Sequence, residues 1–252
     1  MGKEMLVKSQ VKYIQSLGQK KFRDQEGAFV AEGPKIVEEL LKAPNLRLLN
    51  IFAGADWLAA IDPAALAGPN PPSITELRKG ELERISTLST PNQVLAIFSK
   101  PSFPPPVFEN LLSLLLDGIQ DPGNLGTIIR IADWFGIRQI VCTPDSADAF
   151  SSKTVQSTMG SITRVQVLYE DPGNIILEHP SVPVYAAVLE GSNVYAMERT
   201  GSGMIIIGNE SKGIGAALLE RVTHRITIPR TGSAESLNAA VATGIILSHL
   251  VR

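Results

Sequence analysis

The second half of the chain alternates short apolar runs with helix-like stretches, and this alternation limits the folds that the chain can adopt. Six apolar runs recur between residues 111 and 228: LLSLLL, QIVCT, RVQVL, VPVYAAV, MIIIG and RITI. Stretches such as NLGTIIRIADWFG and GAALLERV separate them. Apolar strands that alternate with helices predict an α/β fold with a mostly parallel sheet covered on both faces. In such sheets ligands bind beyond the carboxyl ends of the strands.

A proline-rich break divides the chain into two predicted domains. Four prolines fall within residues 101–106, a composition typical of a stiff, extended linker. We therefore expect domains at residues 1–98 and 106–252, joined by a linker at 99–105. The first half has the pattern of a small α/β unit that begins with a basic helix. GAFVAEGPKIVEELLK is expected to form a short strand that runs into a helix, RLLNIFAG is strand-like, and the apolar stretch VLAIFSK closes the unit.

The composition is that of a folded protein and excludes several kinds of site. Apolar residues make up 44% of the 252 residues, which is ample for a packed core. Charged residues make up 19%, which is not the composition of a disordered chain. The single cysteine, Cys142, allows neither a disulfide nor a thiolate cluster within one chain. His179, His224 and His249 lack ligand spacing, so no metal is expected. No apolar stretch reaches signal-peptide or membrane-spanning length, which favours a soluble cytoplasmic protein with no membrane partner.

The charge of the chain is balanced overall but concentrated at its start. The formal net charge is -2, so no global basic field indicates a nucleic-acid partner. Residues 1–23, however, hold six basic residues against one acidic residue, a net charge of +5. The cluster includes Lys20, Lys21 and Arg23. We expect these side chains to contact a polyanion such as RNA.

Three loops directly follow predicted strands and carry the residue types of a binding site. In the first, DGIQDPGNLGTIIR, Asn124 is a good helix N-cap and Arg130 follows six positions later. A helix N-terminus presents free N–H groups to anions, and arginine offers a planar donor fork suited to phosphate. Taken alone, the loop fits equally well a capped helix with an exposed arginine.

The second loop, GNESKGIG, follows the strand MIIIG and is rich in glycine. Counting five residues on from Gly208 gives Gly213, but Ile214 stands where a phosphate-binding P-loop requires lysine. No GxGxxG dinucleotide fingerprint occurs either, and the chain has no GxSxG hydrolase motif. On this loop alone a glycine-rich strand–helix turn is the simpler interpretation.

The third loop, IPRTGSAESLN, ends the strand RITI at a proline and continues with small polar residues. Asn238 is expected in the first turn of the helix that follows. By itself the loop fits a multiply capped helix start. Since all three loops follow parallel strands, we expect them to converge on one crevice.

Three motifs, in their order along the chain, resemble those of the SpoU, or TrmH-like, branch of the SPOUT RNA methyltransferases. They are N-x-G-x-x-x-R at residues 124–130, I-G-N-E-x-x-G at 207–213 and I-P-x-x-G-x-x-E-S-L-N at 228–238. The resemblance spans the whole second domain. Residues 16–41 are similar to the family's substrate-binding module of ribosomal-protein type. The resemblance implies a deep trefoil knot in the C-terminal domain and a homodimer with its active site at the subunit interface.

The resemblance also implies S-adenosylmethionine as methyl donor, bound in a bent form largely by backbone groups of the knotted loops. The positions that match the family's adenine pocket are Leu189, Gly208, Ile228 and Leu237. The implied reaction is transfer of the sulfonium methyl to a ribose 2′-hydroxyl of ribosomal or transfer RNA. No metal is required.

Five positions match the family's catalytic residues: Asn124, Arg130, Glu210, Ser236 and Asn238. Arg130 is expected either to act as a base or to bind phosphate and stabilise an alkoxide; the second role fits its very high pKa better. Glu210 either holds the arginine or caps the third loop, and Ser236 either relays a proton or caps the helix. The alternative function is a protein that binds RNA on this fold without methylating it. The intact motif residues favour the enzyme.

Overall fold

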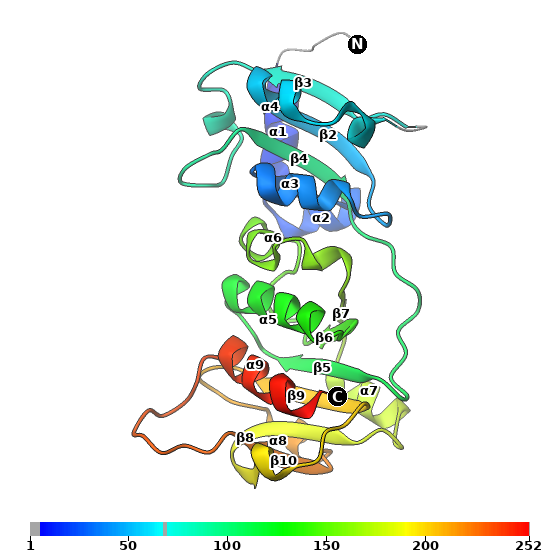
Figure 1. The fold of residues 1–252 in the computed structure, drawn as a ribbon, viewed down its shortest axis with the longest axis vertical. Coiled ribbons are helices and arrows are strands. Elements are labelled where there is room, and N and C mark those ends of the chain that lie inside the picture. Colours follow the sequence, from blue (N-terminus) through cyan, green and yellow to red (C-terminus); the bar gives the residue numbers. More distant parts are fainter. Residues whose placement is uncertain (1–5, 68–69, 252) are drawn as a thin grey trace. The chain divides into compact units, whose positions relative to one another are not determined.

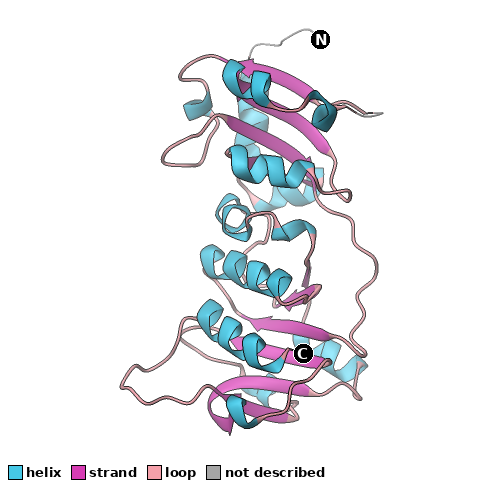
Figure 2. Cartoon of the chain, in the orientation of Figure 1, coloured by secondary structure: helices cyan, strands magenta, loops and turns pink. Residues whose placement is uncertain are grey.

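The computed structural model describes residues 6–67 and 70–251, and the chain forms two compact units. The first unit comprises residues 1–103 together with 150–163, and the second comprises 104–149 together with 164–252. Residues 100–108, between the last strand of the first unit and the first strand of the second, contain no helix or strand (Figure 2).

The first unit contains a four-stranded mixed sheet with the strand order β1-β4-β2-β3. Strand β4 pairs antiparallel with both β1 and β2, while β2 and the edge strand β3 run parallel. The sequence patterns predicted β1, β2 and β4, whereas β3 was not predicted. The strands are β1 (Ala28–Glu32), β2 (Leu48–Gly54), β3 (Ser73–Leu77) and β4 (Val94–Ser99).

Helices cover both faces of this sheet. Ile14 and Leu17, from the first helix and its end, pack into one core cluster with Val30, Phe52 and Leu95 of the strands. The helices of this part are α1 (Lys8–Ser16), α2 (Lys20–Glu26), α3 (Pro34–Leu41) and α4 (Ala55–Ala60), with 3₁₀ turns η1 (Pro63–Leu66) and η2 (Leu82–Arg84). The predicted basic helix is thus present as α1.

One segment of the first unit comes from much later in the sequence. It contains α6 (Ser152–Thr158) and η3 (Ser161–Thr163), and α6 packs against β1. The Phe150 ring lies 5.2 Å from that of Phe29, and Gln156 Nε2 donates to the backbone oxygen of Glu32 at 2.7 Å. The structure therefore groups residues 150–163 differently from the predicted range 106–252. The predicted domain boundaries themselves stay a prediction.

The second unit contains a six-stranded sheet with the order β10-β8-β9-β5-β6-β7, and every neighbouring pair is parallel. Each of the six apolar runs forms one of these strands, so the predicted parallel α/β sheet is confirmed. The strands are β5 (Leu112–Asp117), β6 (Gln139–Cys142), β7 (Gln166–Tyr169), β8 (Val184–Asn193), β9 (Gly203–Gly208) and β10 (His224–Thr227).

Side chains alternate between the two faces of this sheet, and each face is covered. Leu115 and Ile206 join Ile175 and Leu218 in one core cluster, on the face covered by α7 and α8. The helices α5 and α9 pack on each other over the opposite face (Figure 1). The second unit's helices are α5 (Pro122–Trp134), α7 (Pro172–Glu178), α8 (Ala216–Leu219) and α9 (Ala239–Leu250), with the 3₁₀ turn η4 (Val194–Ala196).

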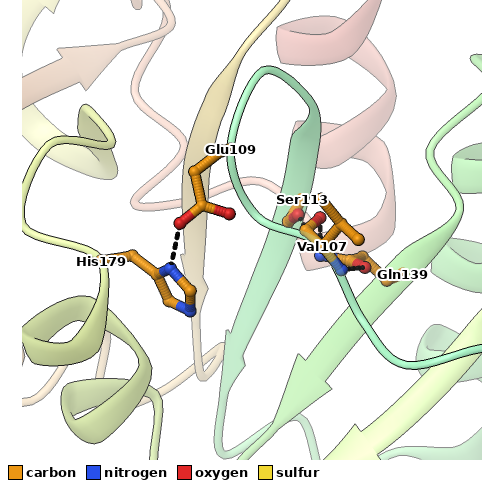
Figure 3. A network of polar contacts seen from close by, with 5 residues as sticks. All are labelled: Val107, Glu109, Ser113, Gln139 and His179. Atoms are coloured by element: carbon orange, nitrogen blue, oxygen red, sulfur yellow. Dashed lines mark hydrogen bonds and ion pairs between the residues drawn. The ribbon is translucent and has the colours of Figure 1, made fainter.

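A polar network holds the chain that enters this sheet (Figure 3). The amide of Gln139 accepts from the backbone nitrogen of Val107 at 3.0 Å, and donates to its oxygen and to Ser113 Oγ, both at 2.8 Å. Beside it, His179 Nδ1 lies 2.5 Å from Glu109 Oε1, and this hydrogen bond lowers the pKa of Glu109. These residues lie at the amino ends of β5 and β6, so they anchor the sheet at the edge opposite to the three loops.

Candidate functional site

The first and second loops start side by side at the carboxyl edge of the sheet. Asp117 at the end of β5 pairs in register with Gly208 at the end of β9. Helix α5 begins after Asp121, whose Oδ1 accepts from the backbone nitrogen of Asn124 at 2.9 Å. The prediction that Asn124 is the N-cap is therefore wrong: Pro122 takes the first helical position, as its fixed φ favours, and Asn124 lies in the first turn.

The third loop reaches the same place at its end. Asn238 is the N-cap of α9, one position earlier than the predicted first turn, and its Oδ1 accepts from Ala240 N at 2.9 Å and Val241 N at 3.2 Å. Between β10 and α9 the loop projects from the sheet, and all residues from 229 to 238 are exposed (Figure 1). Its small polar residues thus remain accessible to a ligand.

A chain of side-chain hydrogen bonds connects the three loops. Asn238 Nδ2 donates to Asn124 Oδ1 at 2.9 Å, and Asn124 Nδ2 donates to Glu210 Oε1 at 2.6 Å. The direction follows from α9: because its N–H groups take the oxygen of Asn238, the NH₂ group must donate to Asn124. Asn124 in turn presents its own NH₂ to the carboxylate. The structure thus brings together three of the five predicted catalytic residues, Asn124, Glu210 and Asn238.

Arg130 and Ser236 lie outside this chain. Arg130 lies six positions after Asn124 on α5, about 9 Å along the helix axis. Its side chain is exposed and makes no hydrogen bond or ion pair with any residue in the described ranges 6–67 and 70–251. Ser236 is exposed, and its hydroxyl has no hydrogen-bond partner among the same residues. Their catalytic roles stay predictions.

The predicted cofactor residues supply apolar surface and close-packed backbone at this edge. Leu189 and Leu237 are 71% and 46% exposed, unusual for leucine, and Ile228 is half-buried. Thr227 Oγ1, at the end of β10, donates to the backbone oxygen of Leu189 in the middle of β8 at 3.0 Å. At Gly208 an added Cβ would lie 2.4 Å from the carbonyl carbon of Gly213. The apolar side chains suit the flat ring faces of the adenine of S-adenosylmethionine, and the nearby backbone suits its polar edge, which needs hydrogen-bond donors and acceptors.

Two further residues shape the site and were not predicted. Asp117 Oδ2 accepts from the backbone nitrogen of Gly215 at 2.7 Å, so the strand end holds the far end of the second loop. Asn209 donates from Nδ2 to the backbone oxygen of Gly118 at 2.7 Å. The signal available in the sequence was a short polar side chain at the end of each apolar strand, where such residues commonly satisfy loop backbone groups.

The three predicted RNA-binding residues near the N-terminus differ in accessibility. Lys20 and Lys21 are exposed on α2. Arg23 is only 3% exposed, and its Nη1 donates to the backbone oxygen of Leu17 at 2.7 Å. Leu17 is the C-cap of α1, so the guanidinium stabilises a helix C-terminus from within the fold. The surface position assumed for Arg23 is therefore wrong, and we do not retain it as an RNA contact.

The part of the chain that the structure describes contains neither a cluster of metal-binding side chains nor a helix that could span a membrane. Across residues 6–67 and 70–251, no three His, Cys, Asp or Glu side chains are grouped as metal ligands would be. None of the helices in these ranges has both the length and the apolar character needed to span a bilayer.

The chain matches two protein-family models, and each model covers a different half of the sequence. Residues 111–248 match the SpoU rRNA Methylase family, and residues 8–96 match the MRM3-like substrate binding domain. The first match contains all three loops of the candidate site.

Individual relatives are similar over nearly the full length. The 23S rRNA (guanosine(2553)-2′-O)-methyltransferase RlmP of Bacillus subtilis (strain 168) is 33% identical over 249 residues, 95% of each chain. A solved structure of a TrmH-family protein from Porphyromonas gingivalis shares 40% identity with a TM-score of 0.86, covering 98% of each chain. The AdoMet-bound rRNA methyltransferase from Sinorhizobium meliloti shares 29% identity with a TM-score of 0.85, covering 99% of this chain and 97% of that one.

Proposed function

Because the chain belongs to the SpoU rRNA methylase family, we propose that it is an S-adenosylmethionine-dependent RNA methyltransferase that modifies a ribose 2′-hydroxyl of ribosomal RNA. Two relatives support this proposal: the Bacillus protein is named as a 2′-O-methyltransferase of 23S rRNA, and the Sinorhizobium structure holds AdoMet. The observation that carries it in this chain is the hydrogen-bonded series Asn238–Asn124–Glu210, which joins the three loops at the carboxyl edge of the sheet.

The residues of the site fit a reaction that needs positioning more than bond-making by the protein. The donor supplies a methyl group on a sulfonium, which is already a strong electrophile. In the transfer the S–C bond breaks and S-adenosylhomocysteine leaves, an O–C bond forms, and the 2′-hydroxyl gives its proton to solvent water. The protein must therefore hold the hydroxyl in line and favour its alkoxide character.

Arg130 has the chemistry to supply that stabilisation. A guanidinium is a positively charged group with N–H donors and no acceptor, so its role is to bind the adjacent phosphate and stabilise negative charge on the 2′-oxygen rather than to accept the proton. Glu210 is held by Asn124 as a hydrogen-bonded acceptor, and it keeps that amide in a fixed orientation. Asn238 holds the other end of the same amide and fixes the start of α9.

The protein works as a homodimer whose interface includes the exposed face of α5 and α9. Trp134 on α5 is 84% exposed and Val241 on α9 is 51% exposed, and the two helices pack on each other. Large apolar side chains so exposed indicate a protein-binding face. In such a dimer Arg130 of one copy serves the Asn124–Glu210 pair of the other, which accounts for its separation from that pair within one chain.

The deep trefoil knot and the cytoplasmic location belong to the same proposal. The three loops follow parallel strands of one sheet, and residues 231–236 are small or polar enough to pass through a narrow opening. Single-molecule stretching tests the knot, because a tightened knot shortens the final extended length below about 3.6 Å per residue. Cell fractionation tests the location.

The reaction itself is tested with labelled S-adenosylmethionine and ribosomal RNA from cells that lack the protein, followed by nucleoside mass spectrometry. Wild type is expected to produce one 2′-O-methylated nucleoside. Asn124→Ala and Arg130→Ala should each lower kcat by about 10²-fold, the usual effect of losing a group that acts at the transition state. Lys42→Ala, a charge change at the C-cap of α3, is the control. RNA binding without any transfer by wild type would favour the non-catalytic alternative.

A further inference from the structure

The second loop is a tight turn that closes on itself. The backbone nitrogen of Asn209 donates to the oxygen of Gly213 at 3.0 Å, and Gly213 N donates back to Asn209 O at 2.9 Å. Gly213 has a φ of 68°, in the left-handed region that glycine adopts without strain. The turn encloses Glu210, so its shape decides where that carboxylate points.

The side chain of Asn209 fills the inside of the turn and uses both ends of its amide. Its Oδ1 accepts from the backbone nitrogens of Ser211 at 2.9 Å and Lys212 at 3.0 Å. Its Nδ2 donates to the oxygen of Gly118 at 2.7 Å, 91 residues away in the sequence. One amide therefore shapes the turn and fastens it to the end of β5.

Gly118 is itself a fixed point on the edge of the sheet. It has a φ of 69°, and its nitrogen donates to Thr143 Oγ1 at 2.9 Å, just beyond the end of β6. The other end of the loop is held where Gly215 N donates to Asp117 Oδ2. The loop is thus attached to Asp117, the last residue of β5, and to Gly118, the residue after it; of these two attachments, the one through Asn209 also sets the turn that contains Glu210.

We propose that Asn209 is the positioning residue that holds the second loop in its cofactor-binding shape and directs Glu210 toward Asn124. This inference rests on the proposed function. The side chain of Asn209 makes no hydrogen bond to Asn124 or Glu210; its partners are Gly118, Ser211 and Lys212. It acts through the backbone: the bonds to Ser211 and Lys212 bend the chain, and the bond to Gly118 places the bend beside α5.

Substitution at position 209 separates the two halves of this role. Aspartate keeps an acceptor for the turn but has no N–H for Gly118 O, and it adds a carboxylate near Asp145, whose Oδ2 lies 3.6 Å from a Cβ position on Gly118. Asn209→Ser keeps a local acceptor on a side chain too short to reach Gly118. Ser211→Ala is the matched control, because it leaves the Ser211 backbone N–H in place on the same loop.

The test measures S-adenosylhomocysteine binding by calorimetry, amide exchange of residues 211 and 212, and kcat and KM. Asn209→Asp is expected to raise the Kd and the KM for the donor at least tenfold, lower kcat, and speed exchange of both amides tenfold. Ser211→Ala should remain within twofold of wild type in all of these. If Asn209→Asp does not fold, Asn209→Ser decides, with the same expected loss of binding.

Two results would overturn the inference, and they are distinguishable. If wild type binds S-adenosylhomocysteine and the folded Asn209 variants bind it within twofold, Asn209 has only a structural role and the proposed function stands. If wild type binds no S-adenosylhomocysteine, the proposed function fails and this inference fails with it.

Discussion

Gly208 lies where the backbone of the neighbouring turn leaves no room for a side chain. A Cβ there would approach Gly213 C at 2.4 Å and Ile214 N at 2.6 Å, and neither atom belongs to a flexible side chain that could move aside. Gly208→Ala should therefore destabilise the protein by about 1–3 kcal/mol, the usual cost of overpacking. Because this turn is part of the second loop, for which we propose a cofactor-binding role, the variant should also bind S-adenosylhomocysteine more weakly.

Gly201→Ala is the control for this prediction. No atom lies within 4 Å of an added Cβ at Gly201, so the free energy of unfolding of that variant should lie within about 1 kcal/mol of the wild-type value. Denaturant unfolding monitored by circular dichroism measures both variants. Equal stability of the two would show that the turn at 208–215 yields easily, contrary to the packing described.

Glu109 gives the fold a pH dependence that has a definite sign. The hydrogen bond from His179, together with backbone hydrogen bonds, holds the pKa of Glu109 below its ordinary value. A carboxylate with a lowered pKa in the folded state stabilises the fold fully above its unfolded pKa, and this contribution is lost as the pH falls through the folded pKa. The stability difference between wild type and Glu109→Gln should therefore be present at about pH 5 and shrink toward pH 3.

Melting temperatures at several pH values check this prediction. Glu178→Gln, on α7 next to His179, serves as the matched control, since it removes a carboxylate with no hydrogen bond to that histidine in the described residues. A wild-type advantage over Glu109→Gln that persists unchanged at pH 3 would contradict the assignment.

Single residues also mark where the sequence was insufficient. A lysine and an arginine look alike in a basic helix, so the pattern placed Arg23 on the surface with Lys20 and Lys21. The structure buries Arg23 against the carbonyl of Leu17, a contact that depends on the turn between two helices and leaves no trace in residue periodicity. Asn209 was overlooked for a similar reason, because its bond to Gly118 spans 91 residues.

At the scale of elements, α2 is the part of the first unit whose charge can be tested directly. Lys20 and Lys21 are both exposed on it. Replacing both by alanine should weaken the binding of ribosomal RNA. The slope of log K against log[salt] should become less steep by about 0.7–0.9 for each phosphate that is no longer neutralised. Filter binding over a series of salt concentrations measures the slope.

Lys42→Ala is the control for α2, since Lys42 is exposed at the end of α3 and paired with Glu39 at 3.5 Å. It removes the same kind of charge from the same unit and should leave the slope unchanged. An unchanged slope for the Lys20 and Lys21 variant would remove α2 from the RNA-binding surface.

The elements themselves were largely predictable where apolar residues were continuous. All six runs in the second half became strands because both faces of a parallel sheet are buried, which makes each strand a solid apolar run. Strand β3, with the sequence SITEL, is an edge strand whose residues are partly exposed, so it has no such signal. The start of α5 was misplaced because Asp121 and Asn124 are both good caps, and only Pro122 between them decides.

At the scale of the whole molecule, the proposed homodimer follows from the exposed face of α5 and α9. Trp134→Glu and Val241→Glu together should give a monomer in light scattering, because each places a charge in a buried apolar interface. Leu177→Glu is the control: Leu177 is 61% exposed on α7, which covers the opposite face of the sheet. If the double variant remains a dimer, the interface lies elsewhere.

Mixed subunits test whether the active site is shared. Arg130→Ala and Asn124→Ala should each have a kcat about 10²-fold below that of wild type when assayed alone. Heterodimers of the two retain one site with an intact Arg130 from one copy and an intact Asn124 from the other, so mixing should restore up to about half of the wild-type activity in each mixed dimer. No recovery on mixing would place Arg130 and Asn124 in the same subunit's site.

The segment 150–163 has a consequence for how the gene can be divided. Its helix α6 packs on β1, yet its codons lie between those for β6 and β7 of the other sheet. A gene fragment that ends after β4 would therefore encode the first unit without a helix that covers its sheet, and the remaining fragment would carry that helix with nothing to cover. A break in the gene at the proline-rich linker, residues 99–105, would therefore separate α6 from the strand on which it packs.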